Sequence, residues 1–506
     1  MREDWIDVSL VKDLNYVKTG VSEFSESKEY YSTGSVKGNS ITSEGVYTYL
    51  DRPSRANRLG YLNDVLQARM KDTDKAILID AKLDQQLFST GFIQIRPNPE
   101  TLSSKYIFHY LKSIIFLNEK DKNCSGSTQS ALNDKSAQNL SIPLAPIPIQ
   151  RAIVSKIEAL FSDLENGIAN LKKAQEQLKI YRQAVLKKAF EGELTKKWRE
   201  QQTNLLTAEE LLIQIKEERQ KHYIQQVEDW KQAIKTWEEN GKEGKKPGKS
   251  RPLDVSVNDD WNIKYETPLK WKSCQLADII SVLTDYHANG SYEVLKENVA
   301  LSDSPDYAVM IRATNFEKND FVRDLKYVNK HGYEFLSKSK LFGGEILIGK
   351  IGNAGRVYHM PYLERKASLA MNLFALRINL VSSKFIFLQL KNFHQQQEIN
   401  NYVKGVGNPT IDKISIRSIH INLCSKEEQH QIVREIESRL SVCDKIEQSI
   451  TESLAKAKAL RQSILKKAFE GRLLSEVEVA QCKLEKDYEP ASILLEKIKK
   501  EKVHGK

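Results

Sequence analysis

Residues 182–192 read RQAVLKKAFEG, and residues 461–471 read RQSILKKAFEG. Nine of the eleven positions are identical, and the two substitutions are conservative. The spacing of 279 residues holds without a gap back to Gln150 and Gln429. A match of this length indicates that the chain contains two copies of one helical arm.

Apolar residues follow a heptad pattern through the first arm. They lie at two sets of positions spaced by seven, which are Ile157, Leu164, Leu171, Leu178 and Val185, and Ile153, Leu160, Gly167, Ala174 and Tyr181. The second arm repeats this pattern more weakly. About five heptads predict a coiled-coil helix of roughly 36 residues, about 50 Å long. A stripe of that length needs a partner of equal length, and the second arm is the obvious candidate.

The globular part of the chain is also duplicated. Trp5 recurs as Trp271 at a spacing of 266, and the segment 63–70 aligns with 344–351 at a spacing of 281. Short apolar runs separated by turn residues, together with helical spacings, predict a mixed α/β domain in each half. The chain is therefore predicted to be a domain-plus-arm unit that is used twice.

Composition shifts place the boundaries of these parts. Prolines at positions 143, 146 and 148 disfavour a helix, so the first arm is predicted to begin after them. The segment GKEGKKPGKSR (241–251) carries five basic residues and one acidic residue and reads as an exposed linker. The predicted parts are the first domain at 1–149, a helical region at 150–240, a basic linker at 241–256, the second domain at 257–426, and a second helical region at 427–506.

Bulk properties narrow the class of protein. The 506 residues favour three or four domains, and a net charge of +10 makes a polyanionic partner such as nucleic acid plausible. The five cysteines never form a C-x-x-C pair, which argues for a reducing compartment. The start of the sequence, MREDW, has no apolar signal segment, and no run of eighteen apolar residues occurs. We therefore expect a cytoplasmic protein that is neither exported nor membrane-spanning.

No convincing catalytic constellation is present in the sequence. The segment Gly344 to Lys350 has the G-x-x-x-x-G-K spacing of a phosphate-binding loop, but Ile351 follows where a magnesium-binding hydroxyl is needed. Paired-cysteine, H-E-x-x-H and His-x-His patterns do not occur. We expect a non-catalytic protein that holds no cofactor and no metal.

Basic and amide residues in the predicted loops are candidates for contacts with DNA. Side chains of these types present forked donors to phosphates or to base edges, and in the first domain they are Arg52, Arg55, Asn57 and Arg58. In the second domain Lys350, Asn353 and Arg356 lie in a glycine-rich turn, and Arg312 and Asn315 precede it. The alternative for each of these residues is that it is an ordinary solvated loop residue that contacts no ligand.

The arms and the domains diverge to different extents. The arm ends are almost identical, whereas the polar loops of the two domains differ nearly everywhere. Identical arms suggest contacts with identical partners, and different loops suggest two different ligands. The predicted partner-docking residues at the arm ends are Arg182, Lys187, Lys188 and Phe190, and Arg461, Lys466, Lys467 and Phe469.

The chain resembles the specificity subunit of type I restriction-modification systems over essentially its full length. The resemblance rests on the duplicated arm end, on the segment GEILIGKIGNAGRV (344–357) and on the entry SIPLAPIPIQ (141–150) into the first arm. It implies two target recognition domains of the α/β class, separated by two long antiparallel coiled-coil arms that are related by a pseudo-two-fold repeat. The first domain lacks the glycine-rich turn, which leaves open which of its loops reads bases.

The resemblance also implies the partners. Each recognition domain would read one half of a bipartite target in double-stranded DNA, and the helical pair would set the unread spacer. Two DNA adenine methyltransferase subunits would dock on the arms, and motor-nuclease subunits would join them. The rival hypotheses are a non-catalytic bivalent scaffold for two protein ligands, which salt would hardly affect, and a self-contained enzyme, which would act without partners.

Overall fold

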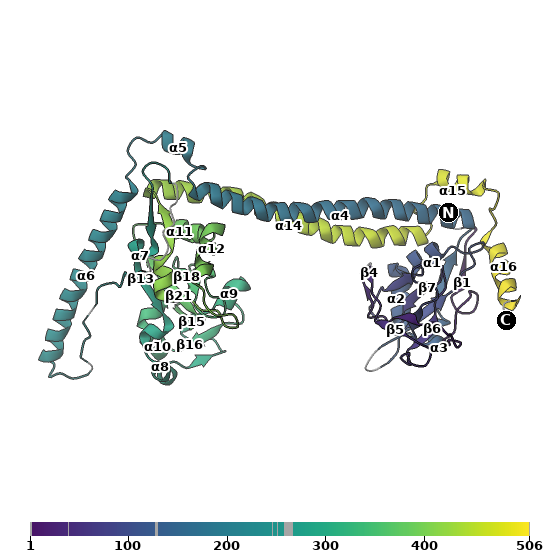
Figure 1. Cartoon of the computed structure of the whole chain (residues 1–506), viewed down its shortest axis with the longest axis horizontal. Helices are drawn as coiled ribbons and strands as arrows, with labels where there is room; N and C mark the ends of the chain where they lie inside the picture. The colour runs from purple at the N-terminus through teal and green to yellow at the C-terminus, as the bar shows by residue number, and fades with distance from the viewer. Residues whose placement is uncertain are drawn as a thin grey trace. The chain divides into compact units, whose positions relative to one another are not determined.

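The computed structural model describes residues 3–38, 40–126, 130–244, 246–249, 251–257 and 267–504. Lys245, Ser250 and the predicted start of the second domain at 258–266 lie outside these ranges. The chain divides into two compact units: unit 1 contains residues 1–174 and 449–506, and unit 2 contains residues 175–448. Figure 1 labels many of the elements of both units. The boundary between the units falls inside the two longest helices.

Unit 1 contains the first domain, which is a set of small sheets flanked by short helices. The first strand pairs with the last in antiparallel register, and the other strands form sheets of three, four and two strands. The strands, in sheet order, are β1 (Ile6–Ser9) and β11 (Ser141–Leu144); β10 (Phe92–Ile95), β7 (Val65–Ala68) and β8 (Ala76–Leu78); β5 (Gly45–Tyr47), β2 (Lys28–Tyr31), β9 (Leu87–Ser89) and β6 (Ala56–Leu59); and β3 (Val36–Lys37) and β4 (Ser40–Ile41). The helices are α1 (Ser104–Leu111), α2 (Ile114–Lys122) and α3 (Asp134–Ala137).

Unit 2 contains the second domain, which repeats this plan with larger sheets. A two-stranded pair again joins the start of the domain to its end. The strands, in sheet order, are β12 (Lys272–Gln275) and β22 (His420–Leu423); β13 (Ile280–Asp285), β21 (Leu373–Ile378), β18 (Ile346–Gly349) and β19 (Val357–His359); and β14 (Leu301–Ser302), β16 (Lys326–Val328), β15 (Ala308–Ile311), β20 (Ala367–Leu369) and β17 (Lys340–Leu341). The helices are α7 (Leu276–Ile279), α8 (Tyr292–Asn298), α9 (Ala313–Glu317), α10 (Lys330–Phe335), α11 (Ser383–Leu390), α12 (Phe393–Tyr402) and α13 (Lys413–Ser418), with 3-10 turns η1 (Tyr286–Asn289) and η2 (Ser337–Ser339).

The two predicted arms are the helices α4 (Ile147–Phe190) and α14 (Lys426–Phe469), each of 44 residues. At 1.5 Å per residue, each helix is about 66 Å long. The prediction that the first arm begins after the prolines was wrong by three residues, because Pro148 lies in the first turn of α4. Proline is tolerated there since the first turn of a helix leaves its backbone N–H groups unpaired in any case.

Ion pairs between α4 and α14 show the predicted antiparallel pairing. In unit 2, the Arg182 guanidinium lies 2.7 Å from the Asp444 carboxylate. In unit 1, the Arg461 guanidinium lies 3.3 Å from the Glu165 carboxylate. Arg461 is the repeat equivalent of Arg182, and Asp444 is the equivalent of Glu165, both at a spacing of 279. Each unit therefore contains the same interhelical ion pair at repeat-equivalent positions, which confirms the predicted internal repeat.

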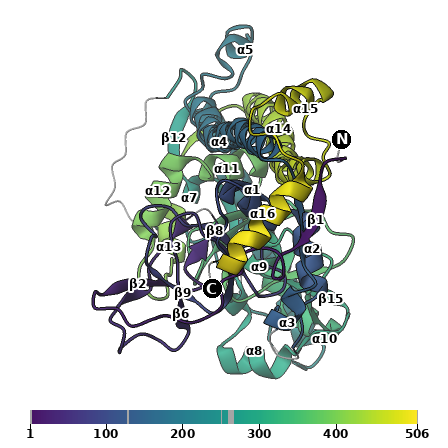
Figure 2. The ribbon, with the colours of Figure 1, turned by 90° about the vertical axis from the view of Figure 1, so that its right-hand side faces the viewer.

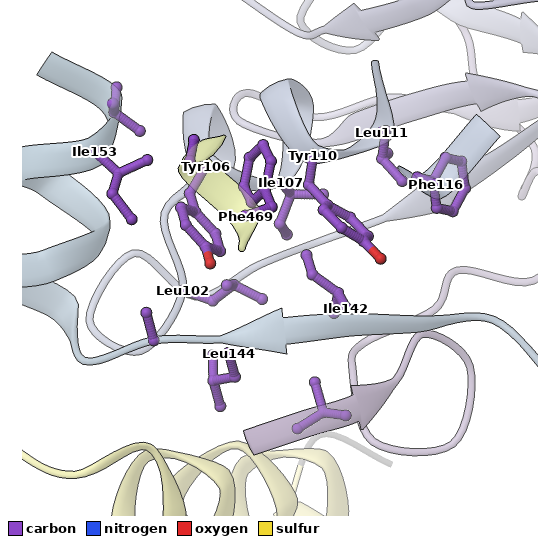
Figure 3. Close-up of a cluster of buried hydrophobic side chains, with 14 of the residues drawn as sticks. Leu102, Tyr106, Ile107, Tyr110, Leu111, Phe116, Ile142, Leu144, Ile153 and Phe469 are labelled. Carbon is purple, nitrogen blue, oxygen red and sulfur yellow. The ribbon is translucent and has the colours of Figure 1, made fainter. Parts of the chain in front are cut away.

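The identical arm ends pack into the cores of their own units. In unit 1, Phe469 lies between Tyr106 and Tyr110, with ring centroids 5.2 and 5.0 Å away (Figure 3). In unit 2, Phe190 makes the corresponding contact with Phe385 at 5.4 Å. The arm ends are therefore part of each domain's hydrophobic core.

A buried glutamine near the start of each arm makes the same hydrogen bonds in both units. The Gln150 Oε1 accepts a hydrogen bond from the Ser103 backbone N–H at 2.9 Å, and its Nε2 donates to the Ala145 carbonyl at 2.7 Å. Gln429 makes the equivalent bonds with Ser382 and Cys424, both at 2.9 Å. Each glutamine thus ties the arm to the first helix after the sheet of its own domain.

The helices that follow the arms complete the two cores. In unit 2, α6 (Ala208–Glu239) buries Ala208, Leu211 and Ile215. In unit 1, α16 (Ala491–His504) buries the equivalent residues and contacts β1 (Figure 2). The short helices α5 (Lys196–Glu200) and α15 (Glu476–Lys483) connect each arm to this helix. The last helix of the chain therefore covers the N-terminal domain, which explains why unit 1 consists of two segments.

The segment after α6, which was predicted to be a linker, folds back onto that helix. In the linker, the Trp230 Nε1 donates to the Pro247 carbonyl, and the Trp237 Nε1 donates to the Gly244 carbonyl, so this segment runs back along α6. All five cysteines lie in described segments and are free thiols. Among the described helices, none is both long and apolar enough to span a bilayer.

Candidate nucleic-acid interface

The glycine-rich turn of the second domain connects β18 to β19. The Gly349 N–H donates to the Arg356 carbonyl at 2.8 Å, and the Gly355 N–H donates to the Gly349 carbonyl at 2.9 Å. A Cβ atom on Gly349 would lie 1.9 Å from the Asn353 carbonyl oxygen, and Gly355 has a φ of 78°. These two positions therefore require glycine, and the turn has one tightly defined shape.

Lys350 of this turn is engaged inside the domain. Its Nζ lies 2.6 Å from the Asp285 carboxylate, and the Nζ of Lys413 lies 2.9 Å from the same carboxylate. Burial alone would raise the pKa of Asp285, but hydrogen bonds from the two lysines outweigh it and hold that pKa below its ordinary value. The Lys350 side chain is only 22% exposed, so it anchors the turn more than it presents charge to a ligand.

Asn353 and Arg356 lie together at the surface of the turn. The Asn353 Nδ2 donates to the Glu317 carboxylate at the end of α9, and an Arg356 guanidinium nitrogen lies 3.3 Å from the same oxygen. The Arg356 side chain is 63% exposed. The structure thus places an amide, a guanidinium and a carboxylate side by side, and each of these groups can hydrogen-bond to base edges.

Arg312 and Asn315 support the loop that follows α9. The Arg312 guanidinium donates to the Asp324 carbonyl at 2.6 Å, and the Asn315 Nδ2 donates to the Asp320 carbonyl at 3.2 Å. The Asn315 Oδ1 accepts the Arg312 backbone N–H at 2.9 Å, and Asn315 is buried. Both side chains are used inside the domain, which favours a structural role over the predicted contact with DNA.

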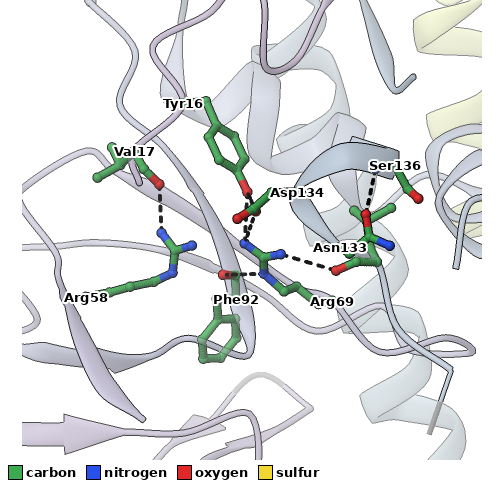
Figure 4. A network of polar contacts seen from close by, with 9 residues as sticks. Tyr16, Val17, Arg58, Arg69, Phe92, Asn133, Asp134 and Ser136 are labelled. Atoms are coloured by element: carbon green, nitrogen blue, oxygen red, sulfur yellow. Dashed lines mark hydrogen bonds and ion pairs between the residues drawn. The ribbon is translucent and has the colours of Figure 1, made fainter. Parts of the chain in front are cut away.

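The predicted basic cluster of the first domain does not form one surface. Its spacing of three suited a helix or loop, but residues 56–59 form strand β6, so neighbouring side chains point to opposite faces. Arg58 is 1% exposed and donates to the Val17 carbonyl at 2.8 Å (Figure 4). Arg52 packs over the Tyr49 ring, with 4.0 Å between its Cζ and the ring centroid. Asn57 is half-buried, which leaves Arg55 as the exposed cation of this segment.

Arg69 is a polar anchor that the sequence reasoning missed. Its guanidinium donates to the Tyr16 hydroxyl at 2.9 Å and pairs with the Asp134 carboxylate (Figure 4). Burial and the hydrogen bond to Asp134 raise the pKa of Tyr16 to about 12. Arg69 occupies the position of Lys350 at the spacing of 281. The alignment of 63–70 with 344–351 places Arg69 opposite Lys350, and it could have identified Arg69 as a candidate residue.

The predicted partner-docking residues fall into three groups. Phe190 and Phe469 are 2% and 1% exposed, so neither can contact a partner without opening its unit. Arg182 and Arg461 pair with carboxylates of the opposite helix. The four lysines of the arm ends are exposed and available to a partner, and they are Lys187, Lys188, Lys466 and Lys467. Burial of the two phenylalanines is a correction to the prediction.

The described residues bring together no group of three or more His, Cys, Asp or Glu side chains that could hold a metal ion. The described residues thus form two α/β domains, each packed on one end of a duplicated pair of long helices. A family profile described as "Type I restriction modification DNA specificity domain" matches residues 15–173 and 268–456, which is more than half of the chain. The chain belongs to this family, and its role is that of a DNA specificity subunit without catalytic activity.

Curated relatives and solved structures agree with this assignment. The chain is 25% identical over 420 residues to the type I restriction enzyme EcoBI specificity subunit of Escherichia coli, covering 82% of this chain and 75% of the relative. It is 23% identical to the EcoKI specificity subunit of Escherichia coli (strain K12), covering 81% and 74%. The HsdS subunit from Thermoanaerobacter tengcongensis has the same fold, with a TM-score of 0.54, 18% identity and coverage of 93% and 98%. A chain from a type I restriction-modification system, solved to explain its assembly and conformational transition, aligns with a TM-score of 0.63 and the same identity and coverage.

Proposed function

We propose that each domain reads one half of a bipartite target in double-stranded DNA, and that α4 and α14 set the length of the unread spacer. The observation that carries this proposal is the contrast within the repeat. The arms make the same intramolecular contacts in both units, while the loop edges carry different side chains. One frame that is used twice with different loops is suited to reading two different sequences.

The charge of the second domain's edge supports a DNA ligand. Arg356 is 63% exposed, and Asn353 lies beside it on the same carboxylate. A guanidinium can contact a phosphate or the two acceptors of a guanine, and an amide can pair with an adenine. An excess of ten positive charges over the whole chain also favours a polyanionic ligand.

We further infer that two adenine methyltransferase subunits dock along the helical pair, one on each arm, and that motor-nuclease subunits join this core. Apolar side chains on both helices support this inference, because they are exposed in the isolated chain. In unit 2 these are Ile180, Val442 and Ile446, which are 71%, 55% and 43% exposed, and in unit 1 Leu460 is 50% exposed. Partner helices would remove these side chains from water. The five free thiols suit a complex that works on DNA in the cytoplasm.

Exchange of the first domain tests the proposal. Residues 1–146, which end just before α4, are replaced by the corresponding domain of a relative, and DNA methylation is mapped in cells that express the complete system. We expect one half of the methylated target to change and the other half and the spacer to stay. A change in both halves would contradict the assignment of one half-site to each domain. DNA binding that is insensitive to salt between 50 and 200 mM would instead favour the scaffold hypothesis.

A further inference from the structure

A small hairpin loop, Lys404 to Thr410, lies beside the glycine-rich turn of the second domain. Lys404 and Thr410 exchange two backbone hydrogen bonds of 2.9 and 2.8 Å, which close the loop. Gly405 has a φ of 92°, and Val406 at the tip is 105% exposed. The loop therefore holds an apolar side chain fully in solvent on a closed, tightly turned backbone.

Backbone hydrogen bonds fix this loop to the glycine-rich turn. The Gly352 N–H donates to the Pro409 carbonyl at 2.9 Å, and the Ile411 N–H donates to the Lys350 carbonyl at 3.1 Å. Ile351 and Thr410 also form an isolated β-bridge. The turn and the hairpin loop are thus one structural piece, which we call the paired loops.

In the first domain, equivalent backbone bonds join the turn after β7 to the base of a hairpin. Ser125 and Ala131 exchange two backbone hydrogen bonds of 3.1 Å, and Gly126 has a φ of 128°. The Lys71 N–H donates to the Ser130 carbonyl at 3.0 Å, and the Leu132 N–H donates to the Arg69 carbonyl at 2.8 Å. Each of these bonds corresponds to one in the second domain at a spacing of 279 or 281. Residues 127–129 at the tip of this hairpin lie outside the described ranges.

The anchor below the paired loops is also present twice, with its charges rearranged. In the first domain, Arg69 pairs with Asp134. In the second domain, the equivalent residues are Lys350 and Lys413, and Asp285 binds both of them. In the first domain an ion pair thus joins the end of β7 directly to α3, and in the second domain Asp285 of β13 bridges the end of β18 and α13. The turn and the base of the hairpin keep the same arrangement in both domains although their side chains differ, because backbone groups make the bonds between them.

We propose that the paired loops of the second domain, and the turn that holds Lys71 in the first domain, are the edges that enter a DNA groove. Val406 contacts base edges in the second domain, and Lys71 contacts a phosphate in the first domain. The inference rests on the proposed function, and it replaces the Arg52–Arg58 segment as the contact surface of the first domain. A frame held by backbone bonds leaves its side chains free to vary, which is what a family of readers with different targets requires. Rigid presentation also reduces the entropy lost on binding.

The experiment on the second domain uses Val406→Ser, with Val294→Ser as the matched control. Val294 is an exposed valine on α8, which packs against α10 and η1. The tagged full chain is isolated with the subunits that accompany it in its own cells and is used to select duplexes from a random DNA library. We expect wild type and Val294→Ser to select the same two-part motif. Val406→Ser should change the base preference in one half only and bind the wild-type duplex about tenfold more weakly.

The experiment on the first domain compares substitutions of two exposed cations, Lys71→Ser and Arg55→Ser. Binding to the wild-type duplex is measured by fluorescence anisotropy at several salt concentrations. Lys71→Ser should weaken binding severalfold and reduce the slope of log affinity against log salt by about one, because one phosphate contact is lost. Arg55→Ser should leave both the affinity and the slope at wild-type values.

Three results would overturn the inference, and they are distinguishable from one another. If wild type selects no two-part motif, the proposed function itself fails, and this inference fails with it. If wild type selects a motif and Val406→Ser leaves both halves unchanged, the paired loops do not read bases in the second domain. If Arg55→Ser reduces the salt slope and Lys71→Ser does not, the first domain contacts DNA through the Arg52–Arg58 segment.

Discussion

Truncation of one arm-end phenylalanine distinguishes a role in the core of the chain from a role in docking a partner. Phe469 is 1% exposed and contacts two tyrosine rings at 5.2 and 5.0 Å. Removal of a buried phenylalanine side chain costs about 3–5 kcal/mol, and each ring pair contributes about 0.5–1.5 kcal/mol. We therefore expect Phe469→Ala to destabilise unit 1 by about 4 kcal/mol, a large part of the stability of a typical domain.

Amide hydrogen exchange of the full chain localises this effect. Protection should fall in α1 and β11, which lie in unit 1, and should stay at the wild-type level in α11 of unit 2. Phe190→Ala should produce the reverse pattern, since Phe190 packs against Phe385 of α11. Lys466→Ala, an exposed change one helical turn before Phe469, is the control and should alter neither unit. The reasoning would be refuted by a Phe469→Ala chain that keeps full protection in unit 1 and yet loses a partner subunit.

Two further predictions concern the pH dependence of the free energy of unfolding and the length of the spacer in the DNA target. Burial between Phe108 and Phe161 lowers the pKa of His109 to about 4, so between pH 6.5 and 4 the unfolded chain binds a proton that the folded chain does not. The free energy of unfolding should therefore decrease as the pH falls through this window, by at most about 1.4 kcal/mol per pH unit, and urea midpoints should show a weaker decrease for His109→Gln. Lengthening both α4 and α14 by one turn adds about 5.4 Å, which against about 3.4 Å per base pair should lengthen the spacer in the methylated target by one or two base pairs; an unchanged spacer would exclude the helices as its determinant.

The sequence predicted the parts of the fold that depend on periodicity and repetition. The heptad pattern predicted both long helices, and the repeat predicted their pairing, which the reciprocal ion pairs of Arg182 and Arg461 confirm. The start of the first helix was placed too late because the proline rule was applied to its first turn, where it does not hold. The covering of the first domain by α16 was not predicted, since no local pattern indicates which domain a terminal helix joins.

The candidate site was predicted less well, because side-chain exposure depends on the local backbone. The Arg52–Arg58 spacing indicated a cationic surface if the segment was a loop or a short helix, but its second half forms strand β6, which buries Arg58. Lys350 lies in the glycine-rich turn as predicted and Asn315 precedes it, but their polar groups are occupied by Asp285 and Asp320. In the second domain, Asn353 and Arg356 combine the predicted location in the glycine-rich turn with a position at the surface.

The near-identity of the arm ends has a cause inside the chain. Ala468 and Phe469 are buried in the core of unit 1, and the equivalent Ala189 and Phe190 are buried in the core of unit 2. Each arm end packs into the equivalent hydrophobic site of its own domain, so its sequence is constrained whether or not a partner binds there. Identity between the arms therefore supports a shared partner only at exposed positions. At the arm ends these are Lys187 and Lys188 with their counterparts Lys466 and Lys467, and a docking test should begin with the lysines rather than with the phenylalanines.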